Sequence, residues 1–162
     1  MTKRTGKGQY SDAKRTGGQK DRIKKRTSEP KDTSKGYYDK HPKWAFQRCD
    51  FDHSKWGMAC NTHSLTDFFK YLSALECQTW SEILTATSGR KGSTRNHYIE
   101  LPKLVKKAQA RAIELNLDEF DELCSIATAG RSRIWGYIKE GIFYIVWFDP
   151  EHEICPSMKR HT

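Results

Sequence analysis

The chain has 162 residues, and its 29 Lys and Arg outnumber 20 Asp and Glu, for a net charge of +9. No apolar run approaches the roughly 20 residues of a transmembrane helix, and the five cysteines are odd in number and scattered. These features argue against a membrane partner and against a disulfide framework, and they favour reduced thiols in the cytoplasm.

The first 41 residues carry nearly all of the excess charge, with 13 Lys and Arg against 5 Asp and Glu. They include one Ile and no Leu, Val, Phe or Trp, so they cannot bury enough apolar surface to offset their conformational entropy. We predict a disordered basic arm over residues 1–41, without the apolar core of a secretory signal. Such an arm attracts phosphates non-specifically, but it also suits a merely solubilising terminus.

Residues 42–162 form the predicted globular domain, which holds all five tryptophans. Residues 44–51 alternate between apolar and polar well enough for a first strand. A helix follows from Ser64 to about Leu75, with apolar residues at helical spacing. Thr79 and Glu82 have the spacing of a capping box, which predicts a short helix to about residue 86.

Cationic side chains mark the next segments as candidate RNA contacts. Residues 88–96 predict a basic loop, and Pro102 opens a third helix whose outer side is basic. The tail after residue 156 is also basic. The alternative for each surface is charge that is simply solvated, in a mobile loop, on a helix side or in a frayed tail. The candidates are Arg90, Lys91 and Arg95 of the loop, Lys103, Lys107 and Arg111 of the helix, and Lys159 and Arg160 of the tail.

The C-terminal third predicts three strands. Residues 123–129 lead through Gly130 into a hairpin, in which Glu140 and Gly141 supply the turn between residues 134–138 and 142–148. The second hairpin strand is seven apolar residues in a row, which is typical of a central strand covered on both faces. The expected fold is α+β: a small antiparallel sheet with two to three helices packed on one face.

Arg131, Arg133 and His152 are the candidate catalytic residues. RNA cleavage by 2′-hydroxyl attack requires a base, an acid and cations that stabilise charge on phosphorus, and these three supply such groups if the strand ends meet. Glu151 or Glu153 would orient the imidazole, and His97 is a further candidate. The alternative is that the arginines are solvated strand positions and His152 is a turn residue.

Two other groups of residues allow alternative readings. Cys49, His53, Cys60 and His63 include the donor types of a tetrahedral zinc site, although their spacing differs from that of ordinary zinc fingers. Buried thiols and surface imidazoles explain the same residues. Tyr137 and Tyr144 suit base stacking, but hairpin aromatic residues more commonly belong to the core.

The C-terminal strands resemble those of the RelE/ParE toxin superfamily. The resemblance lies in residues 123–138, where a strand ends in a glycine-containing turn before an Arg-led strand, and in residues 141–152, where a hydrophobic strand runs into a His. The sheet-and-helix layout of that family is similar to the one derived above. The basic arm, the segment between residues 88 and 116, and the tail depart from the usual toxins.

The resemblance implies a toxin of a toxin–antitoxin pair that cleaves mRNA on the ribosome without a cofactor. Arg131 and Arg133 would correspond to family cationic positions, and His152 to the terminal histidine. Gyrase-directed relatives share the fold without cleaving RNA, so the fold alone does not define the activity. A non-catalytic nucleic-acid- or ribosome-binding protein is the alternative.

Overall fold

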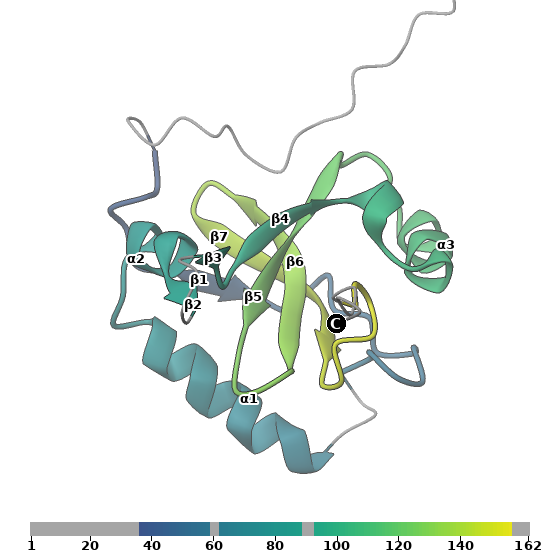
Figure 1. Ribbon diagram of the computed structural model, residues 1–162, viewed down its shortest axis with the longest axis horizontal. Helices are drawn as coiled ribbons and strands as arrows, with labels where there is room; N and C mark the ends of the chain where they lie inside the picture. The colour runs from purple at the N-terminus through teal and green to yellow at the C-terminus, as the bar shows by residue number, and fades with distance from the viewer. Residues whose placement is uncertain (1–35, 59–61, 89–92, 157–162) are drawn as a thin grey trace, which may run out of the picture.

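The structure is a computed structural model, and it describes residues 36–58, 62–88 and 93–156. Its centre is a five-stranded sheet (Figure 1). Two shorter strands pair only with each other. The sheet strands are β1 (Lys43–Ala45), β4 (His97–Glu100), β5 (Glu122–Ala127), β6 (Arg133–Lys139) and β7 (Ile142–Asp149), in the spatial order β1-β7-β6-β5-β4, and the short pair is β2 (Thr87–Ser88) and β3 (Ser93–Thr94).

The sheet is mixed, whereas the sequence analysis predicted an antiparallel one. β1 runs parallel to β7, and the other neighbouring pairs are antiparallel. β1 also ends at Ala45 rather than near residue 51, because the chain turns there, with the Cys49 amide donating to the Phe46 carbonyl. The direction of β1 depends on the path of the chain between it and β7, which its own residues do not encode.

β6 and β7 form the predicted hairpin. Glu140 and Gly141 both have positive φ, 55° and 81°, as a type I′ turn requires. β7 lies between β1 and β6, and its apolar run contributes to two separate cores: Phe143 belongs to one, and Val146 belongs to the other. The prediction of a central strand covered on both faces is confirmed.

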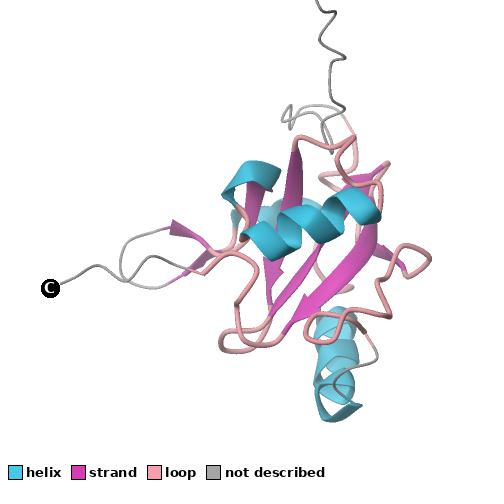
Figure 2. Ribbon diagram, turned by 90° about the vertical axis from the view of Figure 1, so that its right-hand side faces the viewer, coloured by secondary structure: helices cyan, strands magenta, loops and turns pink. Residues whose placement is uncertain are grey.

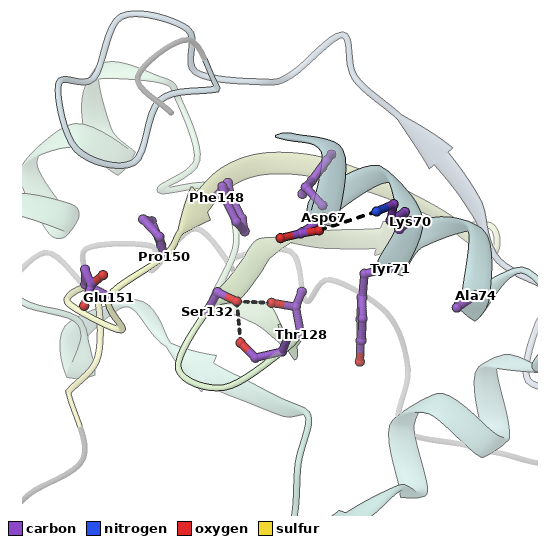
Figure 3. A pocket seen from close by; sticks show the side chains of 11 residues that line it. Asp67, Lys70, Tyr71, Ala74, Thr128, Ser132, Phe148, Pro150 and Glu151 are labelled. Atoms are coloured by element: carbon purple, nitrogen blue, oxygen red, sulfur yellow. Dashed lines mark hydrogen bonds and ion pairs between the residues drawn. The ribbon is translucent and has the colours of Figure 1, made fainter. Parts of the chain in front are cut away.

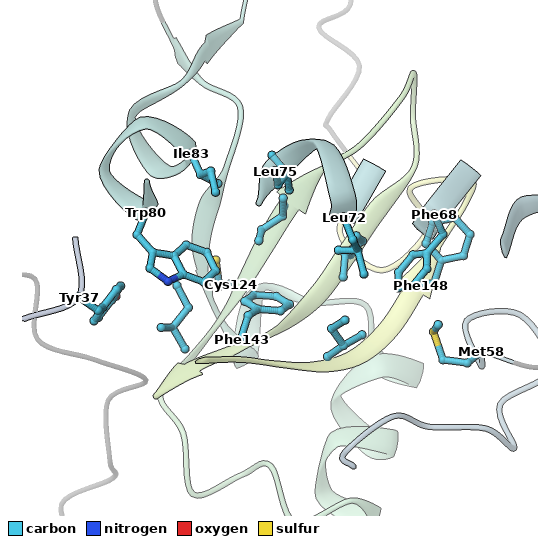
Figure 4. Packing of buried hydrophobic residues seen from close by; sticks show 14 residues of the cluster. Tyr37, Met58, Phe68, Leu72, Leu75, Trp80, Ile83, Cys124, Phe143 and Phe148 are labelled. Atoms are coloured by element: carbon cyan, nitrogen blue, oxygen red, sulfur yellow. The ribbon is translucent and has the colours of Figure 1, made fainter. Parts of the chain in front are cut away.

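Helices cover both faces of the sheet, so the prediction that they share one face is wrong (Figures 1 and 2). On one face, two helices bury Phe68 and Trp80 against the sheet (Figure 4). On the other face, a third helix buries Ala108 and Ala112. Since β5, β6 and β7 have apolar side chains on both sides, each side has to be covered from water. The helices are α1 (Thr62–Leu75), α2 (Trp80–Thr85) and α3 (Lys106–Glu114).

The helix signals in the sequence locate α1 and α2 well. Thr79 and Glu82 form the predicted capping box, and Trp80 follows as the first residue of α2. α1 begins two residues before Ser64. In the third helical region, Pro102 lies in a 3-10 turn, η2 (Leu101–Lys103), and α3 starts after it.

The folded part of the chain begins before residue 42. Tyr37 is 4% exposed and packs in the same core as Trp80, with its ring centroid 6.0 Å from the Trp80 ring. The Trp80 amide donates to the Lys40 carbonyl, and the Ser81 amide donates to the Tyr38 carbonyl. The predicted arm therefore ends too late, because two tyrosines near its end supply apolar surface. Residues 1–35 lie outside the described part of the chain.

Candidate functional site

A pocket of about 370 Å³ lies at the end of the sheet where β5 turns into β6. Two guanidinium groups and an imidazole line it, so we call it the cationic pocket. Its lining comes from the β3–β4 segment and from the β5–β6 turn, which are far apart in sequence. The lining residues are Ser93, Thr94, Arg95, His97, Ala127, Gly130 and Arg133.

Strand register and one buried amide explain why these side chains share a pocket. Arg133 lies opposite Ala127, and His97 lies opposite Ser125, two residues from Ala127 on the same side of β5. Asn96 is 8% exposed; its side chain donates to the Ile83 carbonyl and accepts from the Ala127 amide at 2.8 Å. Because Asn96 points inward, the two residues flanking it turn toward the pocket.

The two guanidinium groups are held by carbonyl groups rather than by carboxylates. Arg133 Nη1 donates to the carbonyls of residues 130, 131 and 132, at 3.4, 3.1 and 2.8 Å, and Arg95 Nη2 donates to the Thr128 carbonyl at 3.2 Å. Burial lowers the pKa of Arg133; Arg95 adds to this effect, whereas Asp149 and Tyr71 oppose it. In the described part of the chain, no carboxylate forms an ion pair with either guanidinium. The pocket therefore has positive charge available for an anion.

His152 lies beside this pocket, in the turn that follows β7. The buried Asp149 carboxylate shapes the turn by accepting from the amides of Glu153 and Ile154, each at 2.9 Å, and His152 takes a positive φ of 60°. Burial lowers the pKa of His152 below 6.5; the charges of Arg133 and His97 lower it further, and Asp149 opposes them. Its imidazole is therefore neutral at pH 7.

The structure places the predicted catalytic residues at one end of the sheet. Arg133 and His152 lie within electrostatic range of each other, and Arg131 is exposed on the turn between β5 and β6. His97, a secondary candidate, lines the pocket itself, with its Nδ1 3.3 Å from Thr94 Oγ1. Thr94 was not among the candidates from the sequence, because a threonine in a polar loop carries no distinguishing signal.

We expected Glu151 or Glu153 to orient the imidazole of His152. Neither glutamate does so. Glu153 pairs with Lys55 at 2.9 Å, and Glu151 is exposed. Among the described residues, no hydrogen bond joins either glutamate to His152. The carboxylate that acts on the imidazole is that of Asp149.

Arg111, predicted to contact RNA, is partly exposed and forms an ion pair with the buried Asp50. Its Nε and Nη2 donate to the two carboxylate oxygens of Asp50 at 2.8 and 2.7 Å, and its Nη1 donates to Glu114. Asp50 is 2% exposed and also accepts from the Trp147 indole at 3.0 Å. The helical spacing of Arg111 was correct, but its partner comes from a loop 61 residues away.

The remaining predicted RNA contacts fall into three groups. Arg95 lies in the cationic pocket. Lys103 forms an exposed ion pair with Glu100 at 2.9 Å, and Lys107 is exposed on α3, on the other side of the sheet from α1. Arg90, Lys91, Lys159 and Arg160 lie outside the described residues.

Of the four zinc candidates, the structure describes the side chains of Cys49 and His53. Cys60 and the His63 side chain lie outside the described residues. His53 Nδ1 accepts from the amides of Lys55 and Trp56, and its ring stacks on the Trp56 ring at 4.1 Å. Burial raises the pKa of the Cys49 thiol to about 11, which disfavours the thiolate that zinc binds. Within the described ranges, no three His, Cys, Asp or Glu side chains gather as a metal site requires.

Tyr137 and Tyr144 form part of an aromatic stack. Tyr137 is 6% exposed and lies between Phe120 and Tyr144, with centroid distances of 4.3 and 5.0 Å. Tyr137 is therefore a core residue, and Tyr144 is the half-buried outer member of the stack. The core alternative is correct for Tyr137.

Comparison of the chain with protein-family models, with curated proteins and with solved structures finds no match. The class of the protein is therefore defined by its own fold and site. It is an α+β protein with a mixed five-stranded sheet and a cationic pocket at one end of that sheet. In the described segments, no helix combines the length and apolar character needed to cross a bilayer.

Proposed function

We propose that the protein is a RelE-like toxin that cleaves RNA by 2′-hydroxyl attack in the cationic pocket. The observation that carries the proposal is the clustering of Arg95, Arg133, His97 and His152 at one end of the sheet, where no carboxylate of the described residues pairs with either arginine. Guanidinium groups suit phosphate because they are always charged and offer several donors in one plane. The mRNA on the ribosome as substrate, and an antitoxin as partner, follow from the resemblance.

Each residue has a role that its surroundings favour. Arg95 and Arg133 would hold the scissile phosphate and stabilise the charge that develops on its oxygens. Neutral His152 would take the proton from the 2′-hydroxyl as this oxygen bonds to phosphorus. His97 would give a proton to the departing 5′-oxygen. The products would be a 2′,3′-cyclic phosphate and a free 5′-hydroxyl.

A non-catalytic RNA- or ribosome-binding protein is the second candidate. One observation favours it: Arg133 Nη1 already bonds three carbonyls of its own turn, so part of its donor capacity maintains the fold. The same pocket would then bind phosphate without cleaving it. Binding by this route is salt-sensitive, because cations released from RNA contribute to the affinity.

The test measures RNA cleavage in the presence of EDTA for the wild type, Arg133→Gln, His152→Gln and His97→Gln. We expect each variant to lose about 10²–10³-fold in rate, because each removes a group that acts in the transition state. Lys139→Gln is the matched control: it removes an exposed charge at the other end of β6. Mapped ends should carry a 2′,3′-cyclic phosphate. Salt-sensitive binding without cleavage would favour the second candidate.

The pKa of His152 gives a readout that does not depend on activity. Because Arg133 lowers this pKa, Arg133→Gln should raise it, and the acid limb of the pH–rate profile should move to higher pH. An NMR titration of the His152 ring measures the shift, and Lys139→Gln should leave it unchanged. If the His152 pKa is unchanged in Arg133→Gln, the Arg133 guanidinium does not act on the His152 imidazole, which would contradict the proposed mechanism.

A further inference from the structure

A second, larger pocket of about 640 Å³ lies between α1 and the β5–β6 turn (Figure 3). We call it the α1 pocket. Asp67, Lys70 and Tyr71 of α1 stand on one side, and Thr128 and Ser132 of the turn stand on the other. Its remaining lining residues are Phe68, Ala74, Ala129, Phe148, Pro150 and Glu151.

The two pockets lie on opposite sides of the same turn. Ala127, Gly130 and Arg133 line the cationic pocket, whereas positions 128, 129 and 132 line the α1 pocket. Tyr71 connects them as well. It lines the α1 pocket and donates to the Ala127 carbonyl, and the charges of Arg95 and Arg133 act on its hydroxyl. Residues of this one turn therefore line both pockets.

The top of the turn leaves room for a chain to pass between the pockets. Gly130 has a φ of 61°, and no atom lies within 4 Å of the position that a Cβ would occupy. Arg131 follows it and is exposed. A polynucleotide could therefore cross the turn at Gly130, with Arg131 near its backbone.

The chemistry of the α1 pocket suits a flat heterocycle with polar edges. Phe68 and Phe148 are 1% and 6% exposed, so they form an apolar floor. At the rim, Asp67 lies 4.0 Å from Lys70, which places an acceptor next to a donor, and Glu151 adds a second acceptor. This rim carries two carboxylates, and carboxylates accept hydrogen bonds from the exocyclic amines of bases.

We propose that the α1 pocket receives the nucleobase next to the phosphate in the cationic pocket, and that it prefers adenine or cytosine over uracil. The inference rests on the proposed function, because it requires RNA in the cationic pocket. Adenine and cytosine each present an amine to the rim. Uracil carries a carbonyl oxygen where cytosine carries its amine, so its N3–H is the one donor on that edge and it can form fewer hydrogen bonds with the two carboxylates.

The test measures the affinity of the full-length protein for 2′-O-methyl tetranucleotides of adenine, cytosine or uracil, which bind but cannot be cleaved. We expect about a tenfold preference for the adenine and cytosine oligonucleotides. The double variant Asp67→Asn/Glu151→Gln should bring this ratio near one. Both side chains are exposed, so the variant should fold. Asp118→Asn/Glu119→Gln, which removes two exposed carboxylates before β5, should keep the wild-type ratio.

Arg133→Gln separates the two proposals. It should weaken binding of all three oligonucleotides by the same factor. Suppose that Arg133→Gln weakens binding of all three oligonucleotides equally. The inference about the α1 pocket is then overturned if the wild type shows no base preference, or if Asp67→Asn/Glu151→Gln keeps that preference. In either case the proposed function is unaffected. If Arg133→Gln leaves all three affinities unchanged, RNA does not occupy the cationic pocket and both proposals fail.

Discussion

The Asp50 carboxylate lies between α3, β7 and the loop after β1, and it accepts hydrogen bonds from each of them. Arg111 donates twice from α3, Trp147 donates from β7, and the amides of Asp52 and His53 donate from the loop. An ion that is 2% exposed carries a large desolvation cost, and these bonds compensate for it. Arg111 thus joins α3 to the loop after β1 through two hydrogen bonds to one carboxylate.

At this scale we predict that Arg111→Ala destabilises the protein by about 3 kcal/mol, because it leaves a buried carboxylate without its cation. Lys103→Ala should cost less than about 1 kcal/mol, because the Lys103–Glu100 pair is largely exposed. Urea unfolding measures both values. RNA affinity of folded Arg111→Ala should equal that of the wild type; a loss of affinity would support Arg111 as an RNA contact.

The same carboxylate gives the stability a pH dependence. Burial would raise the pKa of Asp50, but hydrogen bonds from Arg111, Trp147 and the Asp52 amide outweigh burial and lower it from 3.8 to about 2. Because the folded-state pKa is the lower one, the contribution is complete above about pH 4 and is lost as the pH falls toward 2. Without Arg111, acid unfolding should begin at a higher pH.

At the scale of the element, the β6–β7 hairpin leaves no room for a side chain at Gly136. A register shift lies between Trp135 and Gly136, and a Cβ on Gly136 would come within 2.1 Å of the Tyr144 carbonyl oxygen. This oxygen belongs to the backbone, so it cannot rotate away. Because of this shift, Trp135 and Trp147 lie opposite each other in the core on the α3 side of the sheet, while the turn keeps its I′ geometry.

We therefore predict that Gly136→Ala destabilises the protein by about 3 kcal/mol, through overpacking against a fixed backbone. Gly130→Ala is the matched comparison. It adds the same methyl group in open space, so its cost should be about 1 kcal/mol, from the left-handed backbone alone. Thermal and urea unfolding of the two variants measure the difference. Equal costs would contradict the close approach at Gly136.

For the whole molecule, we propose that the basic arm and the folded domain would contribute separately to RNA binding. The arm supplies most of the net charge, and the cationic pocket supplies the fixed geometry. Five phosphate contacts by the arm correspond to a log–log salt slope of about −4. The domain also depends on Tyr37, so the two parts are joined closer to residue 36 than to residue 41.

Deletion of residues 1–35 should leave the unfolding free energy nearly unchanged and make the salt slope of RNA binding shallower by about 3–4. Deletion of residues 1–41 should in addition destabilise the domain, because it removes buried Tyr37 and the carbonyls that bond α2. Binding titrations at several salt concentrations and urea unfolding test both variants. A shorter deletion that already unfolds the domain would show that the arm is part of the fold.

Local signals in the sequence predicted the elements whose causes are local. The capping box at Thr79 begins α2, the turn at Glu140 and Gly141 closes the hairpin, and the unbroken apolar run became a strand buried on both faces. β4 was missed because His97–Glu100 is short, lies at the edge of the sheet and has no clear alternation. Helix spacing placed Arg111 on the basic side of α3 but could not reveal its partner Asp50, which is 61 residues away.

The sequence by itself determined which segments are charged and which are apolar. This pattern was enough to predict the hairpin, two helices and the candidates Arg133 and His152. Only the tertiary structure decided the parallel pairing of β1, the cover on both faces of the sheet, and the meeting of Arg95 and His97 with the β5–β6 turn. The physical reason is range. Turn chemistry and periodicity act over a few residues, whereas pockets depend on contacts such as the bond from Asn96 to Ala127, 31 positions away.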